Sequence, residues 1–218
     1  MKIAISTSSW ARKLFLLLLL TDLCFLVLHV FFLMGQWNDP YLSLYSIEKD
    51  RGFAEFFQYT KEYWCVLLLS FFIVKKRSPL YLCWMLLFLY LLLDDFASIH
   101  EKLGLSLSRS LGLVPIFGLR ARDFGELIVS ASVGLFFVSY IGIAYRLGNR
   151  VFRKVSRYLI TMLLLLAAFG IAIDLVHIVV PDSLSNAFGF LEDGGEMIVM
   201  SAIVTFIFTL CEDLFEKK

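Results

Sequence analysis

Residues 14–34 read LFLLLLLTDLCFLVLHVFFLM, a largely apolar run that contains one acid and one histidine, Asp22 and His29. A helix needs roughly 20 residues to cross a hydrocarbon core about 30 Å thick, and this run is long enough. Because backbone amides facing lipid must bond within their own segment, such an unbroken run predicts a helix rather than a barrel strand. Five similar runs follow, at about 55–74, 80–99, 124–145, 158–180 and 191–211. The sequence therefore predicts an all-α integral membrane protein with six transmembrane helices.

The start of the chain also has a feature of secretory signal peptides, since Lys2, Arg12 and Lys13 precede the leucine-rich run. No small-residue cleavage site follows, and the apolar run continues to Met34, so we interpret it as the first transmembrane helix. The chain has 218 residues, 60% of them hydrophobic, with no polar stretch long enough for a second folded unit. We therefore expect a single transmembrane domain that covers residues 1–218.

The basic residues predict how the helices are oriented. When the connections are assigned to alternate sides, thirteen of the 20 lysines and arginines fall on the side that holds both termini. The smaller set on the other side comprises Lys49, Arg51, Lys61, Lys102, Arg109, Arg120 and Arg122. Basic residues concentrate on the cytoplasmic side, so this distribution places both termini in the cytoplasm. We expect a multi-pass protein of a bacterial inner (cytoplasmic) membrane.

Two segments in the second half of the chain match without a gap. Residues 122–129 read RDFGELIV and open the fourth run, while residues 192–199 read EDGGEMIV and open the sixth. The preceding runs also end alike, with His100 after one and His177 near the end of the other. This self-similarity predicts two copies of a helical hairpin.

The first two runs resemble a weaker third copy. Asp22 and His29 lie on the first run, and Glu55, Gln58 and Glu62 follow on the second. The predicted fold is therefore three repeated helical hairpins, two of them clear, whose tips lie on the outer side. Their expected bounds are about 14–74, 80–145 and 158–211. The mixed apolar and charged segments at two of these tips, 35–54 and 101–121, fit helices that lie at the membrane interface or roof a cavity.

Ionisable side chains gather at one depth of the predicted bundle. Counting about 1.5 Å per residue along each helix places them in or near the outer leaflet, with Asp22 close to the middle of the membrane. An ionised group in lipid costs at least a few kcal/mol, so these side chains are expected to face the bundle interior and enclose a polar cavity open to the outside. Besides the three histidines, the layer includes Asp22, Glu62, Asp94, Asp95, Asp123, Glu126, Asp174, Asp193 and Glu196.

Imidazole and carboxylate groups are the usual ligands of Zn, Fe and Mn, and a cation would relieve the mutual repulsion of so many acids. We therefore expect a divalent metal cofactor, as one or two ions. The candidate metal ligands are His29, Asp95, His100, Glu126, Asp174, His177 and Glu196. The sequence lacks a G-x-S-x-G motif, a P-loop and a dinucleotide fingerprint. Only Asp174-Leu175-Val176-His177 approaches the E-x-x-H pattern of di-iron helices, with aspartate in place of glutamate.

A structural interpretation of the same layer stays open. Acids near helix N-termini stabilise the helix dipole, and Asp123 and Asp193 are suitably placed to act as caps. Arg120 and Arg122 can neutralise neighbouring acids in a network of salt bridges without any metal. The deeper acids are hardest to explain in this way, namely Asp22, Glu62 and Glu196.

Three classes of function are compatible with this pattern. The first is a metal-dependent hydrolase of a lipid-like substrate, with Glu196 or Asp95 as the catalytic general base. The second is a cation or proton transporter or channel, since transporters often carry ionisable groups between repeats. The third is a structural or accessory membrane subunit with a salt-bridged polar layer. For partners we expect membrane lipids and no nucleic acid, with a homo-oligomer or a larger membrane complex left open.

Overall fold

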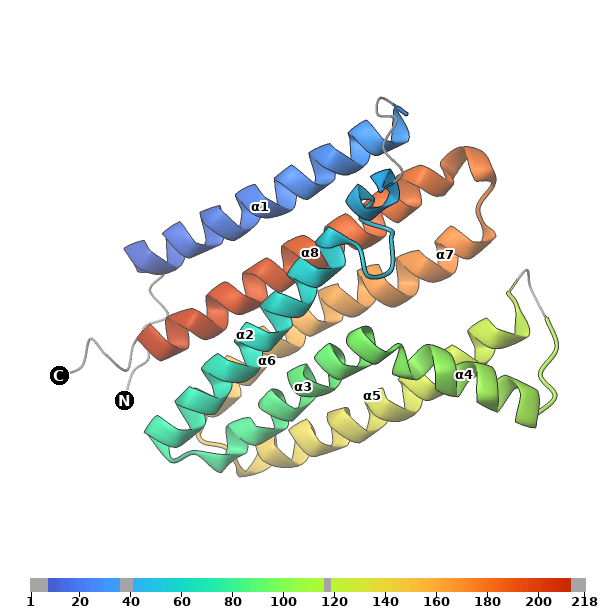
Figure 1. Ribbon diagram of the computed structural model, residues 1–218. Helices are drawn as coiled ribbons and strands as arrows, with labels where there is room; N and C mark the ends of the chain where they lie inside the picture. Colours follow the sequence, from blue (N-terminus) through green and yellow to red (C-terminus); the bar gives the residue numbers. More distant parts are fainter. Residues whose placement is uncertain (1–7, 36–40, 116–118, 213–218) are drawn as a thin grey trace.

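The fold is described from a computed structural model for residues 8–35, 41–115 and 119–212, and its elements are helices (Figure 1). This confirms the all-α prediction for the described residues. In chain order the elements are α1 (Ser9–Leu33), η1 (Leu42–Tyr45), α2 (Phe53–Lys76), η2 (Pro79–Tyr81), α3 (Leu82–Ala97), α4 (Ile99–Ser110), α5 (Ala121–Leu147), α6 (Arg150–Ala167), η3 (Ala168–Ile173), α7 (Asp174–Val179) and α8 (Asp182–Glu212).

Within the described residues, five helical segments are long and apolar enough to cross a membrane, which is consistent with a membrane protein. They are Ser9–Leu33, Pro79–Ala97, Ala121–Leu147, Arg150–Val179 and Ser183–Glu212. The remaining long helix, α2, is not among them, and its middle carries the charged residues Lys61 and Glu62. All six predicted apolar runs are therefore helical, and five of them meet the requirement for a membrane span.

Helix α8 lies at the centre of the bundle, with α1, α2 and the α6–η3–α7 segment packed around it, and α3 lies between α2 and α5 (Figure 1). Met200, Ile203 and Val204 of α8 are completely buried. Lipid chains are as apolar as these side chains, so close packing, more than hydrophobic burial, holds such helices together. The first predicted hairpin packs differently from the others, because α1 lies mainly along α8 and meets α2 through side chains such as Phe25 and Phe57.

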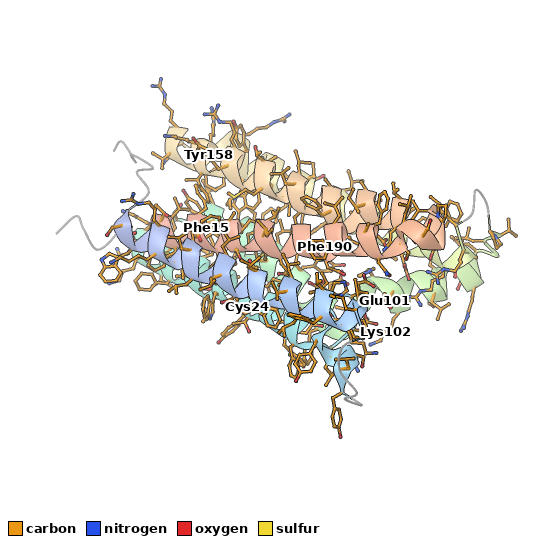
Figure 2. The ribbon with its side chains drawn as sticks, turned by 90° about the horizontal axis from the view of Figure 1, so that it is seen from above. Phe15, Cys24, Glu101, Lys102, Tyr158 and Phe190 are labelled. Carbon is orange, nitrogen blue, oxygen red and sulfur yellow. The ribbon has the colours of Figure 1, made fainter. Side chains whose placement is uncertain are left out.

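The two ends of the bundle differ in character. The start of α1 and the end of α8 lie together, since the Ser8 hydroxyl donates a hydrogen bond to Glu212. The short connections after α2 and α5 turn at this same end, which we call the basic end (Figure 1). Viewed from above, Phe15 lies toward the basic end, whereas Glu101 and Lys102 of α4 lie toward the opposite end (Figure 2). We call that opposite end the α4 end.

Two breaks in the helices shape the α4 end of the bundle. Ser98 adopts a left-handed conformation with φ of 48°, which ends α3 and starts α4. A Cβ added to Gly125 of α5 would lie 2.0 Å from the Gly104 carbonyl oxygen of α4, so only glycine allows this approach. The tip segment 101–121 thus contains a helix, as predicted, and that helix packs on α5. The second break is η3, a π-helix between α6 and α7 of a kind that often marks functional sites.

Candidate functional site

A fully buried ion pair connects three helices in the interior of the bundle. The Lys61 ammonium of α2 donates to the Asp22 carboxylate of α1 at 3.0 Å and to the Met197 carbonyl of α8 at 2.8 Å. The Ser201 hydroxyl of α8 donates to the other Asp22 oxygen at 2.5 Å. Asp22, Lys61 and Ser201 are all completely buried, and their polar groups satisfy one another. Such a pair holds the helices in register, because loss of either partner would leave a buried charge alone.

This geometry corrects one part of the orientation argument. The alternate-side assignment placed Lys61 in an outer connection, whereas Lys61 lies inside α2 with none of its side chain exposed. The physical reason is the carboxylate of Asp22, which allows an ammonium group to be buried far from water. Without Lys61, the basic residues within the described part of the chain still favour the basic end by ten to six.

Next to this ion pair lies a cavity of about 370 Å³ with one acidic and one apolar wall. Its acids, amide and imidazole come from α2, α3, α4 and α8, and they include most of the deep acids that the sequence singles out. They are Gln58, Glu62, Asp94, Asp95, His100 and Glu196. The apolar wall comes from α3, α5 and α6, where the rings of Tyr90 and Phe137 pack 5.8 Å apart.

Three carboxyl groups face one another in this cavity. Glu62 and Asp95 lie close enough to share a hydrogen bond, and Glu196 interacts electrostatically with both. The carboxylate of Glu196 reaches η3 beside Gly170, where a Cβ would lie 1.8 Å from its oxygen. Among the described residues, none of the three acids forms an ion pair. Carboxylates this close repel one another unless a proton or a cation lies between them.

Two buried acceptor atoms in the cavity also lack a partner. They are Oε1 of Gln58, a residue only 7% exposed, and Oε2 of Glu62, a residue only 2% exposed. A buried polar atom without a hydrogen bond is unfavourable by roughly 1–3 kcal/mol. Both atoms accept hydrogen bonds or coordinate cations, so the cavity is complementary to a positively charged or proton-donating ligand.

The cavity continues toward the α4 end of the bundle. A second cavity of about 170 Å³ shares Gln58, Asp94, Asp95, His100 and Glu196 with the first, and its further lining includes residues 47–50 and Asp193. A third, of about 60 Å³, is lined by His100 together with Asp123, Glu126 and Asp174. The predicted layer of acids therefore does gather around a polar space, and that space reaches the α4 end.

The three histidines, by contrast, do not gather there. Each is paired with a different acid, and His29 and His177 line none of these three cavities. Within the described part of the chain, no three His, Cys, Asp or Glu side chains are grouped so that they could hold a metal ion. The expected ligand set is thus divided, because each imidazole lies beside a different acid. His29 lies 3.7 Å from Glu48, His100 lies 2.8 Å from Asp94, and His177 lies 2.9 Å from Glu192.

The individual histidine contacts show what each ring does. Nδ1 of His29 accepts the Ile47 backbone N–H at 3.3 Å and lies 3.2 Å from the Ser46 hydroxyl, which anchors the loop that borders the second cavity. The Nδ1 atom of His177 lies 2.9 Å from Glu192, and its Nε2 atom lies 2.9 Å from the Ser185 hydroxyl.

His100 is the histidine that lines all three cavities. Its Nδ1 atom lies 2.8 Å from Asp94, which also accepts the His100 backbone N–H at 2.8 Å. The hydrogen bond to Asp94 raises the pKa of His100, and partial burial opposes the rise. This pair fixes the break between α3 and α4 and places an imidazole beside the acids.

The acids that open α5 have basic partners. Arg120 donates to Asp123 at 2.8 Å, and Arg122 donates to Glu126 at 2.5 Å and to Glu101 at 2.7 Å. Asp123 also accepts the Arg120 backbone N–H at 2.7 Å, so it caps the helix. The structural interpretation therefore holds for Asp123 and for Glu126, although Glu126 was also expected among the metal ligands.

Two polar residues of the interior were not placed in the predicted site. Gln58 is the middle member of the Glu55, Gln58 and Glu62 stripe on α2, but a neutral amide in a sequence does not by itself indicate a binding site. Lys61 lies next to Glu62 on a helix that must bury both side chains. Its position inside a predicted membrane helix, together with the lone aspartate of the first run, is the signal that could have paired it with Asp22.

Comparison with known families identifies one match. A family described as a domain of unknown function, DUF8692, matches residues 14–210 of the chain. The chain therefore belongs to this family. No curated protein matches it, and no solved structure matches it.

Proposed function

We propose that this protein binds a cation in its acid-lined cavity and that the cation enters from the outer side of the membrane. The observation that carries the proposal is the group of Glu62, Asp95 and Glu196, which face one another beside the unpartnered Gln58 amide oxygen. Glu62 is buried, Asp95 and Glu196 are half-buried, and none of the three forms an ion pair among the described residues, so their carboxylates repel one another unless positive charge lies between them. A bound cation or proton supplies this positive charge.

The membrane arrangement belongs to the same proposal. We take α2 as a sixth span, since its 24 residues are long enough and its charges at Lys61 and Glu62 are buried against other helices. With both termini in the cytoplasm and three hairpins pointing outward, the basic end is cytoplasmic and the α4 end is outside. The matching segments 122–129 of α5 and 192–199 of α8 support a repeat of the second and third hairpins.

The Asp22–Lys61 pair makes the cavity a candidate uptake site rather than an open channel. The pair contacts Met197 and Ser201, which follow Glu196 along α8 toward the basic end. Transport would require the pair to separate, as an inner gate. Vesicles containing the protein would then show cation flux that disappears in Asp22→Asn, whereas a protein that only binds would show none.

Binding is testable on the purified full-length protein in lipid nanodiscs. Separate titrations with Na⁺, Ca²⁺, Mn²⁺, Zn²⁺ and methylammonium, followed by thermal unfolding, should identify at least one cation that raises the unfolding temperature. A ligand at about 100 times its Kd stabilises the folded state by about 2.7 kcal/mol. Glu196→Gln should remove this stabilisation, while Glu126→Gln, whose parent side chain is already paired with Arg122, should retain it. The absence of any cation effect in the folded wild-type protein would overturn the proposal.

A metal-dependent hydrolase is the second candidate, favoured by the position of the expected general bases. Asp95 and Glu196 line the same cavity as the Asp94–His100 pair, which resembles the oriented imidazoles of general acid–base sites. A Zn, Fe or Mn ion at this place would need these side chains to move closer together than they are now. Elemental analysis of a chelator-free preparation tests this candidate, because protein without stoichiometric metal would argue strongly against it.

A further inference from the structure

The cavity also has an apolar wall, which a small inorganic cation bound at the acids would not contact. Nine apolar residues from three helices and η3 line this wall. They are Leu87, Tyr90, Leu91, Val133, Phe137, Leu163, Leu166, Ala167 and Ile171. At about 370 Å³ the space is large enough for a chain of carbon atoms as well as a charged group. The ligand that fills it should therefore have one positively charged end and one apolar end.

The apolar wall also opens sideways, at a depth where lipid surrounds the bundle. Gly134 lies near the middle of α5, lines the cavity and is exposed, and a Cβ built there meets no atom within 4 Å. Ile171 of η3, on the other side of this opening, is 41% exposed. The cavity can thus be reached from the hydrocarbon between α5 and the α6–η3 segment as well as from the α4 end.

The polar wall specifies the charged end of the ligand. A primary ammonium group has three N–H donors and one positive charge. The cavity presents carboxylates from Glu62, Asp95 and Glu196, and the amide oxygen of Gln58 adds a neutral acceptor. These acceptors are not arranged as a compact metal site among the described residues, but an ammonium group bonds to acceptors at hydrogen-bond distances and needs no such compact shell.

From these observations we propose that the cavity binds a primary-amine amphiphile, with the ammonium at Glu62, Asp95 and Glu196 and the alkyl chain along the wall that Gly134 opens. This proposal rests on the proposed cation-binding function and names the class of ligand. Because lipid chains are as apolar as the wall, the chain gains little on leaving the bilayer and the charged head decides which amphiphile binds. An alcohol or an anion of the same chain length should be rejected.

Dodecylamine bound to the full-length protein in nanodiscs is a direct probe. We expect it to raise the unfolding temperature and to stay bound in native mass spectra, whereas dodecanol and dodecyl sulfate at the same lipid ratio should do neither. Glu62→Gln together with Glu196→Gln should weaken dodecylamine binding by at least about tenfold, which corresponds to about 1.4 kcal/mol. Binding of dodecanol equal to that of dodecylamine would overturn the charged-head assignment.

A pair of glycine substitutions on one helix tests the position of the chain. Gly134→Leu would place a side chain in the opening of the cavity, and Gly142→Leu, also at an exposed glycine of α5 with nothing within 4 Å, would not. Gly134→Leu should weaken dodecylamine binding by at least about tenfold and leave methylammonium binding intact, while Gly142→Leu should change neither. If methylammonium binds but both leucine variants take up dodecylamine like the wild type, the amphiphile inference fails and the cation-binding function stands. If neither amine nor any metal cation binds, both fail.

Discussion

The start of α5, residues 122–129, and a segment inside α8, residues 192–199, have similar sequences but different surroundings; α8 itself begins earlier than expected, at Asp182. In α5, Asp123 pairs with Arg120 and Glu126 pairs with Arg122. In α8, the position that matches Arg122 is Glu192, and Glu196 faces Glu62 and Asp95 instead of an arginine. Both arginines of the α5 copy are thus replaced in the α8 copy, Arg120 by Phe190 and Arg122 by Glu192, and Glu196 lines an acidic cavity instead of forming an ion pair among the described residues.

The matching glycines, Gly125 and Gly195, also pack against different neighbours. Gly125 allows α5 to approach the backbone of α4 at Gly104, whereas Gly195 allows α8 to approach the ring of Phe169 in η3. Both glycines permit a close contact, but the first contact pairs two rigid backbones and the second lies against a π-helix. The α5 copy therefore serves packing, and the α8 copy lies where a ligand can be bound.

The largest effect should come from Lys61, which is fully buried against Met197 of the α8 copy. Lys61→Met leaves the Asp22 carboxylate without its ion pair in the interior, so unfolding free energy should fall by about 3–5 kcal/mol. Chemical unfolding in detergent measures this loss. The double variant Lys61→Met with Asp22→Asn should recover much of it, since no unpaired charge remains, and a double variant as unstable as the single one would contradict the ion-pair explanation.

The next prediction compares the two matching glutamates, Glu126 and Glu196. Glu196→Gln should weaken binding of the stabilising cation by more than about tenfold, because it removes a carboxylate from the cavity. Glu126→Gln should leave cation binding unchanged and lower stability by less than about 1 kcal/mol, because its pair with Arg122 is partly exposed to solvent. Calorimetric titration of both variants provides the comparison, and equal losses of affinity would mean that the two copies do not differ in function.

A smaller effect is expected when the arginine of the α5 copy is placed in the α8 copy. Glu192→Arg positions a guanidinium four residues before Glu196, the spacing that joins Arg122 to Glu126. It should weaken cation binding by about three- to tenfold, since a fixed charge competes with the ligand. Glu192→Gln is the control, because it also removes the contact with His177 but adds no charge. Similar affinities for the two variants would exclude competition by the arginine.

The smallest effect concerns His100 and depends on pH. The Asp94 contact raises the pKa of His100 above its ordinary 6.5 in the folded protein. The protonated ring therefore contributes stability that is fully present below pH 6.5 and is lost as pH rises through the folded-state pKa. The side chain is one-third exposed, so the contribution should be about 1 kcal/mol or less.

The unfolding free energy, measured between pH 5 and pH 9, should fall with rising pH in the wild type as His100 loses its proton. In His100→Gln this pH dependence should have a smaller slope. His177→Gln is a useful comparison, because it removes a histidine that does not line the cavity. An unchanged slope in His100→Gln would assign the pH dependence to other groups, of which Glu101 and Glu126 are the nearest charged neighbours of His100 after Asp94.

Much of the architecture could be predicted because it depends on local sequence. Each apolar run is a helix, and the segment 101–121 contains the further helix α4. Of the deep acids, Glu62 and Glu196 line one cavity together with Asp95, whereas Asp22 pairs with Lys61 instead. The separation of the three histidines could not be predicted, because depth along a helix does not specify which neighbour a ring meets.

What the sequence alone determined is therefore that the described residues form apolar helices, five of them long enough to span a membrane, and that acids lie between these helices. Those properties follow from helix length and from the free energy of placing charge in lipid, which act within each segment. Only the tertiary structure decided which acids are neutralised and which remain open to a ligand. Asp22 is paired with Lys61, 39 residues away, and with Ser201, 179 residues away, and contacts of that kind arise only when α1, α2 and α8 pack together.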